Sequence, residues 1–171
     1  MSLVLEKRFD AITVQQLLDR AEVGRTSFYQ RYRNKDDFLL KSFERMLEAY
    51  DHVLTSEGPA CLRVAPVREL FGHIRENHGF HRALGRSRKL DDMYQAGVDT
   101  MTGTIGARLP DTPPLLARAY AGALFALLRW WIDKGYDYTP QDMDDLFHGM
   151  VRGTLSFAGV VRDMPQPARD V

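Results

Sequence analysis

Apolar residues recur at helical spacing along almost the whole chain. The first clear run consists of Val14, Leu17, Leu18 and Ala21, which occupy the i, i+3, i+4 and i+7 positions of one helix face. A longer run with the same spacing extends over residues 39–54. No segment alternates convincingly between apolar and polar residues, which is the pattern of a half-buried strand. The chain is therefore predicted to be all-α.

Helix-breaking residues divide this pattern into long segments. They cluster in SEGPA (56–60), LPDTPP (109–114), KGYDYTP (134–140) and MPQPARDV (164–171). We expect helices between these clusters. One is predicted from Pro114 to Lys134, and another begins at Thr139 and Pro140, because proline is favoured in the first turn of a helix.

The first fifty residues are divided more finely. Thr13 and Gln16 have the spacing of a capping box, so a helix is predicted to begin after Thr13 and to end near Ala21. Gly24 then interrupts the pattern, and we expect a tight turn there that needs a residue without a side chain. Only twelve residues precede Thr13, and residues 3–9 are those that can be helical, so the first helix is predicted to be shortened.

A second short helix is predicted from Arg25 to about Tyr32. Asn34 can cap a third helix, which begins at Lys35 and continues toward Leu54. Two short helices joined by a turn and followed by a long helix form a helix-turn-helix unit, in which the second short helix is the one that reads DNA.

The charge of the chain is balanced overall but not locally. The protein has 23 Lys and Arg residues and 23 Asp and Glu residues, so no net field draws it to polyanions. Residues 20–35, in contrast, contain five basic residues and one acidic residue, Glu22, which is a local net charge of +4. This excess indicates a nucleic-acid contact, with a solvated charged face as the alternative.

The second short helix has the size and the chemistry to enter a DNA groove. Eight residues form a helix about 12 Å long, and the major groove of B-DNA is about 12 Å wide. Arg25, Thr26 and Ser27 at its start are predicted to contact base edges, and Gln30 is predicted to pair with adenine.

Other side chains are predicted to contact phosphates or to hold the helix in place. The predicted phosphate contacts are Thr13, Tyr29, Tyr32 and Lys35. Phe28 and Val23 are expected to point inward against the preceding helix. For Tyr32, a half-buried core position is an equal alternative.

Candidates for other chemistry are few. Cys61 is the only cysteine, which excludes a disulfide framework and a thiolate metal cluster and fits a reducing, cytoplasmic location. His73, His78 and His81 are spaced by five and three residues, which does not place all three on one helix face, so no metal site is expected. No apolar run approaches the roughly 20 residues of a membrane span. Neither a membrane partner nor a cofactor is expected.

Several features of residues 12–44 occur together: Thr13 at a helix start, the Ala21…Val23-Gly24 turn, the Phe28-Tyr29 pair and the Asn34-Lys35…Leu39 helix start. With them, ITVQQLLDRAEVGRTSFYQRYRNKDDFLLKSFE resembles the DNA-binding motif of the tetracycline-repressor (TetR) family of bacterial transcription regulators. Residues 117–147 also look like the last two helices of some members. The resemblance implies a helix-turn-helix DNA-binding domain over residues 1–44 and an effector-binding and dimerisation domain over residues 45–171.

The resemblance further implies a ligand-responsive regulator, most simply a repressor. Such a protein binds a palindromic operator in double-stranded DNA as a homodimer and is released by a small-molecule effector. The predicted dimer interface lies on the two C-terminal helices and consists of Leu124, Leu128, Trp131, Met143, Leu146, Phe147 and Met150. The predicted effector pocket consists of Phe71, Arg75, His78, Met93, Tyr94, Met101, Phe125, Arg129 and Trp130. For both sets an ordinary hydrophobic core is the alternative.

Two other classes of function compete with a regulator. An enzyme is not expected, because the sequence has no Gly-rich phosphate loop, no nucleophile elbow and no His-Glu-x-x-His motif. The second alternative is a helical small-molecule-binding or protein-interaction module that has lost DNA binding, which the shortened first helix favours. Sequence-selective binding to duplex DNA separates this module from a regulator.

Overall fold

The computed structural model of the protein describes residues 9–56, 63–79, 81 and 89–162. Over these residues every regular element is a helix, which confirms the predicted all-α fold. The elements are the 3-10 turn η1 (Phe9–Ala11) and the helices α2 (Val14–Ala21), α3 (Arg25–Tyr29), α4 (Lys35–Ser56), α5 (Val67–Glu76), α7 (Lys89–Arg108), α8 (Pro114–Asp133) and α9 (Pro140–Arg162). The shortened helix predicted over residues 3–9 lies, apart from Phe9, outside the described residues.

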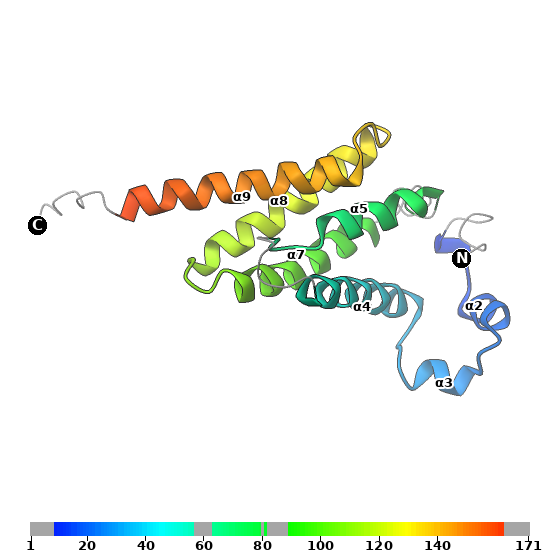
Figure 1. Ribbon diagram of the computed structural model, residues 1–171. Coiled ribbons are helices and arrows are strands. Elements are labelled where there is room, and N and C mark those ends of the chain that lie inside the picture. The colour runs from blue at the N-terminus through cyan, green and yellow to red at the C-terminus, as the bar shows by residue number, and fades with distance from the viewer. Residues whose placement is uncertain (1–8, 57–62, 80, 82–88, 163–171) are drawn as a thin grey trace, which may run out of the picture.

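The long helices form an elongated body with a small helical unit at one end (Figure 1). Within the body, α7 packs against both α4 and α8, and α5 packs against α9. The helices α2 and α3 lie beyond the N-terminal end of α4. The body and the small unit are therefore connected through α4.

The domain boundary predicted between residues 44 and 45 falls inside α4. This helix continues without interruption from Lys35 to Ser56. Its first turn follows α3 directly, and its later turns contribute to the core of the body. The same helix therefore belongs to the body and leads to the unit that carries α3. The division into two functional domains stays a prediction.

Large apolar side chains from all five long helices build the core of the body. Leu47, Phe71, Met101, Trp131 and Phe147, one from each of these helices, have an exposed fraction of 0%. The ring centroids of Phe71 and Trp131 lie 4.9 Å apart. Burial of each such side chain contributes about 1.5–3 kcal/mol relative to its exposure to water. The hydrophobic effect thus fixes the body as one packed unit.

By length and apolar composition, α8 is a helix that could cross a membrane. The sequence pattern had not indicated such a segment, because Arg118 and Arg129 divide its apolar residues into shorter runs. Leu124, Leu128 and Trp131 of this helix are buried in the core of the body. Burial of these side chains in the core accounts for one face of this helix, while Leu115 and Trp130 on it are exposed.

The start of α2 has the capping box that the sequence predicts. The Gln16 backbone N–H donates to the Thr13 hydroxyl at 3.2 Å, and the Thr13 backbone N–H donates to Gln16 Oε1 at 3.0 Å. The prediction for the following turn was wrong. Glu22 adopts the left-handed conformation there, with a φ of 52°, whereas Gly24 is extended, with a φ of −67°. A Cβ at Gly24 would meet no other atom within 4 Å, so the fold does not require glycine there.

The second short helix is shorter than predicted, because its last turn tightens. α3 ends at Tyr29, and the Arg31 backbone N–H then bonds to the Phe28 carbonyl, three residues back, at 3.0 Å. The Tyr32 N–H also reaches the Phe28 carbonyl, at 2.9 Å. The hydrogen-bonded turn thus extends to the predicted end of the helix, although the regular helix does not.

Asn34 caps α4 as the sequence predicts. Its Oδ1 accepts the Asp37 backbone N–H at 2.8 Å, and the Asp37 carboxylate accepts the Arg33 backbone N–H at 2.9 Å. These reciprocal bonds satisfy donors at the start of α4 that have no partner within the helix. They also fix the turn that joins α3 to α4.

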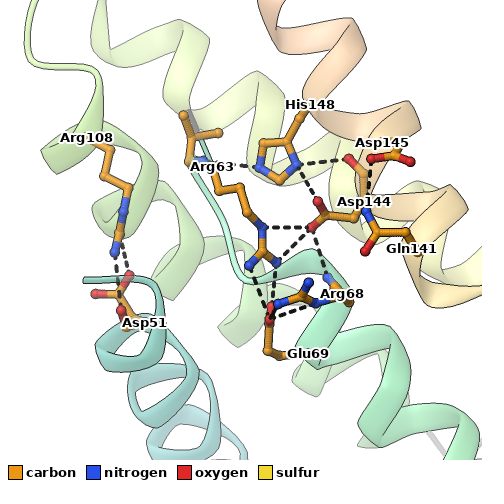
Figure 2. A network of polar contacts seen from close by, with 10 residues as sticks. Asp51, Arg63, Arg68, Glu69, Arg108, Gln141, Asp144, Asp145 and His148 are labelled. Atoms are coloured by element: carbon orange, nitrogen blue, oxygen red, sulfur yellow. Dashed lines mark hydrogen bonds and ion pairs between the residues drawn. The ribbon is translucent and has the colours of Figure 1, made fainter. Parts of the chain in front are cut away.

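A buried network of charged side chains joins the segment before α5 to α9 (Figure 2). The Arg63 guanidinium donates to the Glu69 carboxylate at 2.6 Å and to Asp144 Oδ1 at 2.9 Å. The side chains of these three residues are 9%, 14% and 7% exposed, so solvent and salt screen the pairs little. The network therefore contributes to how α5 and α9 are held together.

His148 and two backbone groups complete this network. The Nε2 of His148 accepts the Val64 backbone N–H at 3.1 Å, while its Nδ1 lies 2.9 Å from the Asp144 backbone carbonyl. This geometry describes a neutral ring that carries its proton on Nδ1. The Arg68 backbone N–H adds a bond to Asp144 Oδ1 at 3.1 Å. Burial opposes ionisation of Asp144, but hydrogen bonds from His148 and Arg63 outweigh it and hold the pKa of this carboxyl at about 2.

Candidate nucleic-acid interface and interior cavity

The helix α3 presents a polar face to solvent. Arg25, Thr26, Ser27 and Gln30, the residues predicted to contact bases, are all exposed. Phe28 lies among them in sequence but is only 6% exposed, and it anchors the helix. A short helix with polar side chains outward and one buried aromatic residue has the form needed to enter a major groove.

An aromatic cluster of Phe28, Tyr32 and Phe38 joins α3 to α4. The Phe28 ring centroid lies 5.3 Å from that of Tyr32 and 5.9 Å from that of Phe38. Val23, which was expected to point inward with Phe28, is instead 43% exposed. The inward position predicted for Val23 was therefore wrong, and Phe38 of α4 is the aromatic neighbour that packs near Phe28.

The two tyrosines predicted to contact phosphates have different surroundings. Tyr29 is 46% exposed, and the Arg25 guanidinium lies 5.8 Å from its ring centroid. Tyr32 is half-buried, and its hydroxyl accepts a hydrogen bond from Arg45. Tyr32 therefore has the half-buried position that the sequence offered as one alternative, and its phosphate contact stays a prediction.

Carboxylates neutralise only part of the basic charge at this end of the protein. Asp37 forms ion pairs with Arg33 at 3.2 Å and with Lys41 at 3.1 Å. Arg25 and Arg31, in contrast, are exposed, and within the described residues neither forms an ion pair with a carboxylate. These two arginines can therefore approach a base edge or a phosphate without breaking an ion pair.

Two of the predicted phosphate contacts already have structural roles. The Thr13 hydroxyl accepts the capping bond of α2 and keeps its own hydrogen for another acceptor. The Lys35 Nζ lies 2.9 Å, 2.8 Å and 2.8 Å from the carbonyl oxygens of Phe9, Asp10 and Ile12. All three donors of this ammonium group are used in these bonds. The geometry therefore ties η1 to α4 through Lys35 and does not support a phosphate contact by this residue.

Replacement of Lys35 by Met is expected to lower the free energy of unfolding by about 1–3 kcal/mol, because three carbonyls lose a charged donor. Denaturation in urea measures this loss. Lys41→Met is the matched control, since the Lys41 side chain is 47% exposed and its ion pair with Asp37 is expected to contribute about 1 kcal/mol. Equal losses in the two variants would contradict the structural role of Lys35.

A cavity of about 240 Å³ that is partly open to solvent lies between α4, the end of α5 and α7. It is lined by Leu39, Ser42, Phe43, Met46, His73, Asn77, His81 and Met93. A narrow crevice lined by three of these residues continues toward Phe125 of α8. Met93 is the one residue of this lining that was predicted as an effector contact. The signal that could have found the four residues from α4 is their i, i+3, i+4, i+7 spacing.

The structure distributes the nine predicted effector contacts over three environments. Met93 lines the cavity, and Tyr94 and Phe125 line the adjoining crevice. Phe71 and Met101 are fully buried in the core instead. The remaining four are exposed: Arg75, His78, Arg129 and Trp130. Helical spacing indicated which residues share a face but not which neighbouring helix covers that face.

Most of the predicted dimer contacts are core residues of the single chain. Five of the seven have an exposed fraction of at most 1%: Leu124, Leu128, Trp131, Met143 and Phe147. A second copy of the chain cannot contact these side chains unless the body rearranges. Their assignment to the dimer interface was therefore wrong, and they belong to the core. Leu146 and Met150 on α9 are 54% and 39% exposed and remain predicted interface residues.

These features define a class of protein, in which a helical body with a partly open cavity carries a short exposed polar helix at one end. No protein-family model matches the chain, and no curated protein matches it. Among solved structures, the fold is similar to that of a candidate TetR-family transcriptional regulator from Syntrophomonas wolfei strain Goettingen. The TM-score is 0.57 and the sequence identity 15%, over 87% of this chain and 86% of that chain. At this identity the likeness establishes the fold.

Proposed function

We propose that the protein is a DNA-binding transcription regulator. The observation that carries the proposal is α3, whose exposed Arg25, Thr26, Ser27 and Gln30 project from a helix that Phe28 anchors. The capped helix α2 precedes it at the spacing of a helix-turn-helix, in which the second helix contacts base edges. The likeness of the fold to a candidate TetR-family regulator supports the same function.

The proposal includes a homodimer on a palindromic operator. Symmetric half-sites require two copies of the recognition helix about 34 Å apart, and a two-fold axis supplies them. Leu146 and Met150 lie one turn apart on α9 and are exposed, which supports this helix as a contact between the two copies.

The proposal also includes release from DNA by a small molecule, so that the protein acts as a repressor. The α4 wall of the cavity belongs to the same helix that begins just after α3. A ligand that binds better when α4 has a second position shifts the population toward that position. A coupling free energy of about 1–3 kcal/mol changes operator affinity about 5- to 150-fold.

Selection from a random duplex library by the purified protein tests the proposal. We expect a palindrome to be enriched, and enrichment to persist at two salt concentrations, because base contacts add to the salt-dependent phosphate term. If neither condition enriches a sequence, the regulator proposal fails. The alternative, a helical binding module without DNA recognition, is then favoured.

The variant Arg25→Ala is expected to bind the selected operator more weakly by about 1–3 kcal/mol and to lose preference at one base pair. Competition titrations with the operator and its single-base variants measure both effects. Lys134→Ala changes an exposed lysine at the end of α8 and serves as the control, with unchanged binding expected.

Arg31→Ala provides the contrast to Arg25→Ala. If Arg31 contacts a phosphate, its loss weakens all duplexes alike and reduces the slope of log affinity against log salt by about one. An equal loss on every sequence from Arg25→Ala would assign Arg25 to the phosphates as well and remove it from base recognition.

A further inference from the structure

We infer that the cavity between α4, α5 and α7 binds a compact, uncharged molecule that combines an apolar ring or chain with one or two hydrogen-bonding groups. The inference rests on the proposed function only in taking this cavity as the effector site. Binding itself requires the protein alone, without DNA.

The volume of the cavity indicates the size of the ligand that it can cover. This volume is about 240 Å³. An apolar protein cavity of about 150 Å³ holds benzene, whereas drug-sized ligands occupy pockets of about 300–1,000 Å³. The space therefore suits a molecule somewhat larger than benzene and smaller than most drugs.

The walls of the cavity are mostly apolar. Leu39, Phe43 and Met46 line it from α4, and Met93 lines it from α7. Methionine side chains adapt to ligands of different outline, and Phe43 offers a ring edge or face to an aromatic ligand. Burial of apolar ligand surface against these side chains supplies the main part of the binding free energy.

A few polar groups stand among the apolar walls: Ser42, His73, Asn77 and His81. The Ser42 hydroxyl forms no hydrogen bond with another described residue, so its donor and acceptor remain for a ligand. The Asn77 side-chain amide donates to the His73 backbone carbonyl at 2.8 Å, which holds this side chain in place. An apolar site with a few fixed polar groups recognises the position of a hydroxyl, carbonyl or amide on its ligand.

The charge of the site selects against ions. No described residue that lines the cavity or the crevice is Asp, Glu, Lys or Arg. Burial, with a smaller effect of His73, lowers the pKa of His81 to about 4, and burial also lowers the pKa of His73. Both rings are therefore neutral at pH 7. An ion that enters would lose part of its hydration without gaining a partner of opposite charge among the described lining residues.

Calorimetric titration of the full chain at pH 7 tests the inference with two probes of matched shape. 2-Naphthol is uncharged at this pH and carries one hydroxyl, whereas 2-naphthoate carries a carboxylate on the same ring system. We expect 2-naphthol to bind at least tenfold more tightly than 2-naphthoate. Equal or tighter binding of the carboxylate overturns the inference, and so does the absence of binding by 2-naphthol.

Variants place the binding in this cavity. Ser42→Leu fills the space from α4 and is expected to weaken 2-naphthol binding at least tenfold. Ala49→Leu adds an aliphatic side chain at an exposed position of the same helix and is expected to bind as the wild type does. Thermal unfolding shows whether Ser42→Leu is folded. If it is not, Met46→Phe, a second variant that fills the cavity, replaces it in the binding measurement. If a folded variant with a filled cavity binds 2-naphthol with wild-type affinity, the ligand does not bind in this cavity.

The two proposals fail in different ways. If 2-naphthol binds but no palindrome is selected, the regulator proposal is wrong and the ligand class holds. If a palindrome is selected but 2-naphthol does not bind, the regulator proposal holds and the ligand class is wrong. Because calorimetry uses no DNA, neither result depends on the other.

Discussion

Replacement of Arg63 by Met is expected to lower the free energy of unfolding by about 3–5 kcal/mol, because it removes one partner from a buried ion network. Asp144 is 5% exposed and would keep its charge without the guanidinium that now lies 2.9 Å from it. Met has a similar length and preserves much of the packing. The decrease in the free energy of unfolding is therefore caused mainly by the uncompensated charge of Asp144 and less by a cavity left by the substitution.

Chemical denaturation of the wild type and two variants measures this effect. Arg68→Met is the matched control, since Arg68 also contacts Glu69 but has a side chain that is 45% exposed. Exposed pairs contribute about 0–1 kcal/mol. If Arg63→Met costs no more than Arg68→Met, then the buried network does not stabilise the contact between α5 and α9.

The pH dependence of Arg63→Met gives a second signature. The folded pKa of Asp144, about 2, lies below its ordinary value of 3.8, so its contribution to stability is complete above about pH 4 and is lost as the pH falls toward 2. Protonation also removes the uncompensated charge from the variant. The stability difference between wild type and Arg63→Met is therefore expected to narrow from pH 5 to pH 2, and a constant difference would contradict this account.

Replacement of Gly97 by Ala is expected to lower the free energy of unfolding by about 1–3 kcal/mol. Gly97 lies where α7 packs against α8, and a Cβ at this position would overlap the ring of Phe125. That ring is 3% exposed and packs edge-on against Phe43 and Tyr94, so it cannot move without disturbing other core residues. Overpacking at this contact separates the two helices.

Gly103→Ala on the same helix is the control for this prediction. A Cβ at Gly103 meets no atom within 4 Å, and Ala is favoured over Gly in a helix interior by about 0.5–1 kcal/mol. The two substitutions are therefore expected to differ by about 1.5–4 kcal/mol, with opposite signs. Thermal or urea unfolding measures the difference.

A compensating variant tests the cause of the loss. Phe125→Leu removes the ring atoms that a Cβ at Gly97 would overlap. The double variant is expected to be more stable than the sum of the two single changes predicts, which a double-mutant cycle measures. Additive losses would mean that the Phe125 ring is not what excludes a side chain at residue 97.

The sequence predicted those parts of the fold that depend on neighbouring residues. The capping box of Thr13 and Gln16 and the Asn34 cap each form between residues three positions apart, so the pattern contains both partners. The start of α9 at Pro140 follows from a local preference in the same way. The predicted glycine turn failed because Glu22, a residue without that preference, takes the left-handed conformation.

Contacts between distant residues could not be read from such patterns. Lys35 resembled a phosphate contact because a lysine near a basic helix is usually solvated, yet its donors reach carbonyls 23 to 26 residues away. Arg63 meets Asp144 across 81 residues. Seven predicted interface residues shared helix faces, but the helix that covers a face is decided by packing, and five of them are core residues here.

By itself, the sequence determined the all-α fold, the starts of α2, α3, α4, α8 and α9 and the polar composition of α3, because hydrophobic periodicity and capping act within one or two helical turns. Only the tertiary structure decided which apolar residues form the core, which arginines are unpaired by carboxylates and where the cavity lies. These properties arise when helices from distant parts of the chain pack together. The neighbouring helices then decide whether one face of a helix is buried, exposed or next to a cavity.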